Sequence, residues 1–444
     1  MPKTPNTHLR DLLTQAAWSG AQLAAALRHT AAEHGQQLAC DRSQVSRCLS
    51  GPRPAMVALL LEVLSRKVQR PISAVEAGLS RAPFMMVDLL VSEGDPVRRL
   101  SQLASADLDP GRRRLLGAGV YSLAALAAWP PRGNPLTGPS AGLPHAPGRS
   151  GRAGLAEAEQ MRTMARVFAE AAQLHGPVHV RTALTAYLGR DVTGYLNAPA
   201  VEAERRQLLS GAAELTILLG TMCAGDGADA LAQHYHGTAA SLAAEAGDAA
   251  TYAIALRTMS AHAHDLGHHS AAVLHLAQRA ADVAPPIVAA YTQAHLAVIQ
   301  AHHSKRAALA ALAAAERHHG QAHDTIPGPF THYPASALHY QRARTLATLR
   351  DRGGATSALT TSLRLRAPGE RQATALTQAR LAETLLAGGH LDAALTHWQA
   401  FLKDYPTLHS SHAERLLQSM RRLLNPHRRH PATNTLLTEA ATLH

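Results

Sequence analysis

The hydrophobic positions near the start of the chain recur at helical spacing. Apolar side chains lie three and four residues apart in segments 6–17, 21–34 and 55–68, and a shorter segment covers 73–79. Such spacing puts the apolar side chains on one face of a helix, where they can pack against neighbouring helices. Residues 1–80 are therefore predicted to form a small helical domain.

The segment between the second and third of these helices has marked ends. Asp41 or Ser43 can accept hydrogen bonds from the first free backbone N–H groups of a helix. Gly51 can adopt the left-handed conformation that closes a helix, and the prolines that follow it prevent continuation. Val45 and Leu49 lie four residues apart and form one apolar stripe. The pattern predicts a short, capped helix whose polar side faces outward.

The polar side of this helix, predicted over 43–49, has the chemistry to recognise DNA. Arginine can bind guanine and glutamine can bind adenine through paired hydrogen bonds in the major groove. Polar residues at the helix ends are better placed for phosphates. The base-reading candidates are Gln44, Ser46 and Arg47, and the phosphate-binding candidates are Arg42, Ser43 and Arg53. The alternative is a solvated helix in a purely structural bundle.

A change of composition after residue 80 predicts a linker over 81–154. Within it, an apolar run over 115–129 follows three arginines, and 130–154 consists mainly of Pro, Gly and Ser. The apolar run has 15 residues, fewer than the roughly 20 that a bilayer-spanning helix needs. A buried or partner-facing helix is therefore favoured over a membrane anchor or an export signal. The Pro- and Gly-rich stretch is predicted to be flexible.

Helical patterns follow one another over residues 155–444, and a turn-then-helix signature with paired alanines recurs among them. The second alanines of the four copies are Ala272, Ala308, Ala358 and Ala394. Two of the gaps between them are 36 residues long, and the middle gap is 50 residues. A Pro- and Gly-rich loop over 320–334 accounts for the excess. A period of this length predicts stacked helix pairs.

The segment Leu381–Trp398 resembles the tetratricopeptide repeat. Ala394 matches the small residue where the two helices of a repeat cross, and Trp398 matches the large residue that follows it. Pro406 matches the terminating proline, whereas Phe401 departs from the small residue that the family prefers. The resemblance implies a superhelical array of helix pairs.

The segments Ser19–Ala24 and Asp41–Pro54 resemble the Cro/repressor-type (XRE-like) helix-turn-helix family. The matching core has the pattern V-S-x-x-L-S-G-x-R-P, but about fourteen extra residues separate Leu27 from Ser43. Together with the repeats, this chain resembles a large actinobacterial group of transcriptional regulators. The resemblance implies transcriptional control through DNA, with the repeat array sensing a ligand or partner.

Composition and charge favour packed helices and an anionic partner. Aromatic residues make up only 4% of the chain while Ala and Leu are abundant, which favours helices over sheets. The formal charge of +11 favours nucleic acid as a partner. Three cysteines without paired spacing indicate a reducing compartment, and the N-terminus lacks an apolar signal core. A cytoplasmic location is therefore expected.

Sequence signatures of common enzyme classes are not found. The chain has no GxxxxGK(S/T) phosphate-binding loop, no GxSxG nucleophile turn, no HExxH motif and no GxGxxG after a strand. We therefore expect a non-enzymatic protein with no catalytic residues and no cofactor.

Histidine is abundant, with 28 residues in the chain. The densest cluster consists of His262, His264, Asp265, His268 and His269. His264 and His268 lie four residues apart and could share a zinc ion, but Gly267 is predicted to break the helix between them. Ordinary buried or surface histidines are therefore favoured, and no metal site is predicted. Some of the few aromatic residues of the array could line a peptide-binding groove, but core filling is favoured.

These patterns predict an all-α chain with a helix-turn-helix domain, a linker and a tetratricopeptide-like solenoid. The favoured function is a sequence-specific transcriptional regulator that binds double-stranded DNA, expected as a homodimer and without a membrane. Its array would bind an unknown peptide, small molecule or protein. The alternative is a protein-interaction scaffold of helical repeats without DNA binding, with a membrane tether at 115–129 as a further variant.

Overall fold

The computed structural model describes residues 6–33, 37–41, 45, 54–79, 94–117, 119–129, 152–321, 330, 332–408 and 410–443. Its regular elements are helices, and these residues contain no strand, which confirms the all-α prediction. The helices are α1 (Thr7–Ala16), α2 (Gly20–Glu33), α4 (Pro54–Val68), α5 (Pro96–Leu108), α6 (Pro110–Gly117), α7 (Leu123–Ala127), α8 (Leu155–His175), α9 (Pro177–Tyr187), α10 (Thr193–Asn197), α11 (Glu202–Gly225), α12 (Asp229–Ala246), α13 (Ala249–Asp265), α14 (Ala271–Val283), α15 (Pro286–Gln300), α16 (Lys305–Gln321), α17 (Ala335–Thr348), α18 (Arg352–Leu365), α19 (Arg371–Ala387), α20 (Leu391–Asp404), α21 (Ser411–Leu424) and α22 (Pro431–Ala441). Single turns of other helix types are η2 (Leu188–Val192), η3 (Tyr405–Thr407) and η4 (Asn425–His427).

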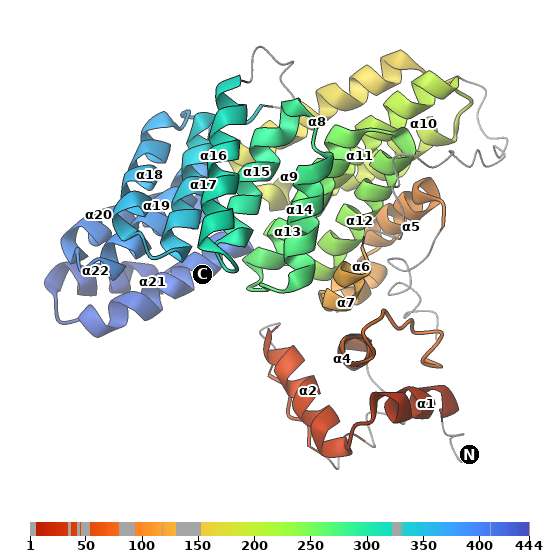
Figure 1. The fold of residues 1–444 in the computed structure, drawn as a ribbon, viewed down its shortest axis with the longest axis horizontal. Helices are drawn as coiled ribbons and strands as arrows, with labels where there is room; N and C mark the ends of the chain where they lie inside the picture. The colour runs from red at the N-terminus through yellow and green to blue at the C-terminus, as the bar shows by residue number, and fades with distance from the viewer. Residues whose placement is uncertain are drawn as a thin grey trace.

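Helices α1, α2 and α4 form a small bundle at the N-terminal end of the chain (Figure 1). Their apolar faces meet in one core that includes Leu9, Leu27 and Leu64. The Asn6 side chain caps α1 by accepting a hydrogen bond from the Leu9 N–H group at 3.0 Å. The three helices predicted from apolar spacing are confirmed, each to within a residue or so at its ends.

The short helix predicted over 73–79 is a series of turns instead. The N–H group of Ala77 donates to the carbonyl oxygen of Ser73 at 3.1 Å, which makes one helical turn. Gly78, at a φ of +63°, then ends it in the left-handed conformation. The side chain of Asn6 donates to the Ala77 carbonyl oxygen at 2.8 Å, so this turn closes the bundle against α1.

Of the helix predicted over 43–49, the structure describes Val45, and it also describes Asp41 just before it. Val45 is 5% exposed and lies in the core of the bundle, as its apolar stripe predicts. Its N–H group donates to the carbonyl oxygen of Asp41 at 3.1 Å, the bond that an N-cap residue accepts. The rest of the predicted helix lies outside the described residues.

The region predicted as a linker over 81–154 contributes packed helices to the body of the molecule. Val97, Leu100 and Leu103 of α5 belong to the same core as α11 and α12. The apolar run over 115–129 is not one helix: α6 ends at Gly117 and α7 begins after Ser122, whose hydroxyl group accepts from the Ala125 N–H at 3.0 Å. Gly117 and Gly119 favour this break because glycine weakens a helix interior. Residues 130–151 lie outside the described part.

The segment around α7 joins the bundle to the array (Figure 1). On one side, the N–H group of Leu123 donates to the Glu62 carboxylate of α4 at 2.8 Å. On the other side, Gln233 of α12 accepts from the Ser122 N–H at 2.8 Å and donates to the Ser122 carbonyl oxygen at 2.7 Å. Tyr121, which is 1% exposed, is buried beside these contacts. The two parts are therefore connected through hydrogen bonds to the backbone of this segment.

From α11 to α20 the helices pack as consecutive pairs, which confirms the predicted helix-pair array (Figure 1). The four second alanines of the predicted repeats all lie in the first two turns of the second helix of a pair, α14, α16, α18 or α20. The longer gap of 50 residues, between Ala308 and Ala358, contains the predicted loop, which follows the end of α16 at Gln321. Residues 322–329 lie outside the described chain. Alanine at the crossings lets the helices approach closely.

The best repeat match occupies the pair α19 and α20. Ala394 is fully buried in the same core cluster as Ala375 and Ala379 of α19, and Trp398 is fully buried one turn later. Phe401, the departure from the family pattern, packs edge-on to Trp398 with ring centroids 5.7 Å apart. The predicted core role of Trp398 is confirmed, and Phe401 is buried beside it.

The array curves until its last helices reach its first ones. The Ser411 hydroxyl group at the start of α21 donates to the carbonyl oxygen of Ala224 in α11 at 3.2 Å. Helix α11 is also the one described helix whose length and apolar character would allow it to cross a membrane. Because 72% of its most apolar window is buried in the array, its composition fits a core helix.

Candidate functional site

The six candidate DNA-binding residues lie outside the described part of the chain. They are Arg42, Ser43, Gln44, Ser46, Arg47 and Arg53. Their role therefore stays a prediction, and the described site with most functional chemistry lies in the array.

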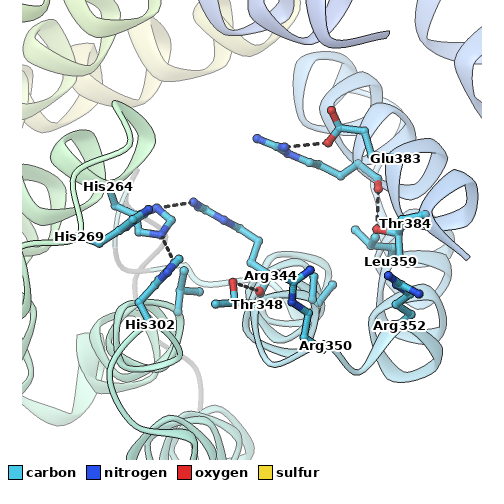
Figure 2. Close-up of a pocket in the computed structure, with 15 residues that line it drawn as sticks. His264, His269, His302, Arg344, Thr348, Arg350, Arg352, Leu359, Glu383 and Thr384 are labelled. Carbon is cyan, nitrogen blue, oxygen red and sulfur yellow. Dashed lines mark hydrogen bonds and ion pairs between the residues drawn. The ribbon is translucent and has the colours of Figure 1, made fainter. Parts of the chain in front are cut away.

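That site is a cavity of about 380 Å³ between α13, α15, α17, α18 and α19 (Figure 2). Its volume is in the range of natural ligand pockets. The histidines His264, His269 and His302 lie together on one side of it. Its four arginines, which we call the arginine wall, are Arg344, whose guanidinium reaches His264, and Arg350, Arg352 and Arg380. Small and apolar side chains such as Ala343 and Leu359 also line the cavity. Cationic and imidazole groups thus dominate its polar surface.

Two arginines of the cavity are held by carboxylates. Arg344 of α17 donates to Asp265 at 2.7 Å, and Arg380 of α19 donates to Glu383 at 2.8 Å. Burial opposes the charge of Arg380, but Glu383 outweighs it and raises the pKa of the guanidinium. Burial likewise opposes ionisation of Asp265, but Arg344 keeps the pKa of that carboxyl well below its usual range.

Two further arginines provide positive charge that no described ion pair neutralises. Arg350 follows α17 in the left-handed conformation, at a φ of +68°, and Arg352 begins α18. Both side chains are exposed at the cavity. The carboxylate between them, Asp351, accepts the Gly354 N–H at 2.9 Å and so caps α18. The cavity therefore has the electrostatics of an anion-binding site.

The predicted helix break in the histidine cluster is confirmed. Helix α13 ends at Asp265, and Gly267 adopts a φ of +89°. The break separates His268 from His264: His268 stacks on Tyr121 with ring centroids 5.9 Å apart. The neighbouring His269 turns toward His264 instead, with ring centroids 5.0 Å apart. The group of close ring nitrogens that includes His264 thus contains His269 and not His268.

A third histidine, His302, completes this group from the loop after α15. Its Nε2 atom lies 3.1 Å from Nε2 of His264, and its ring stacks on His269 with centroids 3.9 Å apart. Burial and the neighbouring histidines lower the pKa of His302 to about 4 and also lower that of His269. The rings of His269 and His302 are therefore neutral near pH 7.

Sequence reasoning missed the arginine wall and His302. A usable signal existed for Arg344 and Arg380, because they are 36 residues apart and occupy the same position in successive repeats. No such signal existed for His302, whose approach to His264 depends on how α13 and α15 stack.

Comparisons with known proteins give limited further information. A sequence profile described as the SP15 N-terminal domain matches residues 9–80, and no curated protein matches the chain significantly. Among solved structures, the crystal structure of the APC/C hetero-tetramer Cut9–Hcn1 aligns with a TM-score of 0.35 and 14% identity, over 85% of this chain and 74% of that chain. At this level the likeness carries no functional argument, and the assignment of an all-α helical array rests on the helices of the chain itself.

Proposed function

We propose that the array is a protein-binding module whose arginine wall takes up an acidic segment of a partner. The observation that carries this proposal is the exposed pair Arg350 and Arg352 at the mouth of the cavity, free of described ion pairs. Guanidinium groups form paired hydrogen bonds with carboxylates, so two neighbouring arginines favour an acidic peptide. Arg344 and Arg380 also line the cavity, but their charges are already paired with Asp265 and Glu383.

The test is a fluorescence-anisotropy titration of the full chain with a labelled peptide of alternating Glu and Ala. The double variant Arg350→Ala/Arg352→Ala should weaken binding about 10-fold or more, since hydrogen bonds to charged groups contribute about 1.5–3 kcal/mol each. The matched control is Arg306→Ala/Arg317→Ala, which removes the same charge from exposed positions of α16 outside the cavity. Equal weakening by both variants would show general charge attraction and would refute the site.

The second part of the proposal is that the N-terminal bundle binds double-stranded DNA and regulates transcription in the cytoplasm, as a homodimer. It is supported by the net charge of +11 and by the burial of Val45, which leaves the polar residues around it as candidates for base contact. Its alternative is an interaction scaffold without DNA binding.

Binding of the full chain to genomic DNA fragments separates these two alternatives. Gln44→Ala and Arg47→Ala should relax sequence preference, whereas Arg53→Ala should weaken all sequences alike and lower the salt dependence. If the full chain shows no sequence preference at all, the scaffold alternative holds and the peptide-binding proposal is unaffected.

A further inference from the structure

Three histidines from separate parts of the chain converge at one edge of the array (Figure 2). His264 comes from the last turn of α13, His269 from the loop before α14, and His302 from the loop after α15. One ring nitrogen of each lies within 4.8 Å of the others. No other group of described residues brings three metal-binding side chains as close together.

We propose that His264, His269 and His302 bind a divalent transition-metal ion, with Zn²⁺ as the best fit. Three imidazole nitrogens suit Zn²⁺, and Zn–N distances of about 2.0–2.1 Å place tetrahedral ligand nitrogens roughly 3.4 Å apart. The 3.1 Å separation of two Nε2 atoms is already close to this value. The three ring nitrogens lie within 4.8 Å of one another and must move closer to share one ion. His269 and His302 are exposed, so their rings can rotate to do this without disturbing the core.

The surroundings of His264 supply the partner that a metal-bound histidine needs. Arg344 Nη2 lies 2.9 Å from Nδ1 of His264 and can only donate, so Nδ1 is the accepting nitrogen of this ring and Nε2 is the one that faces His302. A metal ion on Nε2 requires the ring proton on Nδ1, and the nearest carboxylate oxygen there is Oδ1 of Asp265, 3.6 Å away, which also accepts from Arg344 at 2.7 Å. A carboxylate that accepts from the remote N–H is the usual support for a histidine ligand. Metal binding thus exchanges the His264–Arg344 contact for a His264–Asp265 contact.

Two of the three ligands are exposed, so a fourth ligand can reach the proposed ion from solvent. Structural zinc sites use four protein ligands, whereas three ligands leave one position for water or another molecule. The site is therefore suited to a ligand group from outside the chain, such as a carboxylate or imidazole.

The test is calorimetric titration of the full chain with ZnCl₂, compared across exposed histidine variants. His302→Ala and His269→Ala should each abolish one Zn²⁺ site per chain or lower its affinity more than about 100-fold. Substituting residues that only support the ligands already lowers metal affinity about 10- to 100-fold, and these variants remove a ligand itself. The matched control is His303→Ala, an exposed neighbour outside the cluster, which should leave that site unchanged. Weaker Zn²⁺ binding to the other histidines is expected as a background that wild type and the three variants share.

The result that overturns the proposal is a Zn²⁺ titration curve that is the same for wild type, His269→Ala and His302→Ala. Circular dichroism of each variant confirms that its helices are retained, and either variant alone decides the question if the other misfolds. A Co²⁺ titration provides the second measurement: the visible absorption of four-coordinate Co²⁺ should develop in wild type and His303→Ala only.

Discussion

Burial inside the array changes the acid–base behaviour of single residues. It is the main reason that the pKa of His234 falls to about 4 and that of Glu214 rises to about 7, with Asp248 adding to the shift of Glu214. Both groups are therefore neutral under conditions where the free side chains would change charge.

Glu214 on α11 makes stability depend on pH. Its folded pKa, about 7, is above the value in the unfolded chain. The folded state thus binds the proton more tightly, and stability falls as pH rises from about 4.5 through 7. Glu214→Gln should therefore raise the melting temperature at pH 8 and leave it nearly unchanged at pH 4, measured by circular dichroism. Equal effects at both pH values would contradict the assigned pKa.

Close packing at one helix crossing makes a glycine necessary. A Cβ atom on Gly220 of α11 would lie 2.4 Å from Cδ2 of the buried His236 in α12. Gly220→Ala should destabilise the chain by about 1–3 kcal/mol, the usual cost of overpacking. Gly320→Ala is the matched control, because nothing lies within 4 Å of its Cβ position. Denaturant unfolding checks both variants, and equal stabilities would show that the crossing can relax.

At the scale of elements, sequence period and apolar spacing predict the helices well. The repeated alanines locate the second helices of four pairs, and Gly267 locates the end of α13. The division of the apolar run into α6 and α7 was not predicted, because composition alone does not show that Ser122 caps a new helix. Neither the cavity nor the histidine group follows from the sequence, since both depend on the stacking angle between successive pairs.

The segment before α7 is the element that holds the bundle against the array. Gln233 makes both of its described hydrogen bonds to the Ser122 backbone. Gln233→Ala should loosen this junction and raise hydrogen exchange in residues 119–129, while exchange in α19 and α20 stays unchanged. The measurement is hydrogen exchange by mass spectrometry. Unchanged protection at 119–129 would show that Leu123 and Tyr121 hold the segment without Gln233.

At the scale of the whole molecule, the proposed metal site and the arginine wall share one cavity. Arg344 contacts His264 on one side and lines the cavity on the other. Zn²⁺ at the histidines removes its contact with His264 and adds positive charge nearby.

Zn²⁺ should therefore tighten binding of the acidic peptide several-fold, within the usual range of coupling between sites. The anisotropy titration is repeated with Zn²⁺ and with a chelator. The effect should persist in His303→Ala and disappear in His302→Ala. An affinity that is independent of Zn²⁺ would mean that the two sites are uncoupled.

The most direct test of the central claim, that the arginine wall recognises acidic segments, is reversal of its exposed charges. The full chain and Arg350→Glu/Arg352→Glu are each titrated with the Glu–Ala peptide and with its Lys–Ala counterpart. Both positions are exposed, so the fold should be retained. The predicted result is that wild type prefers the acidic peptide and that the variant reverses this preference. If both chains bind the acidic peptide equally well, its site lies elsewhere on the molecule.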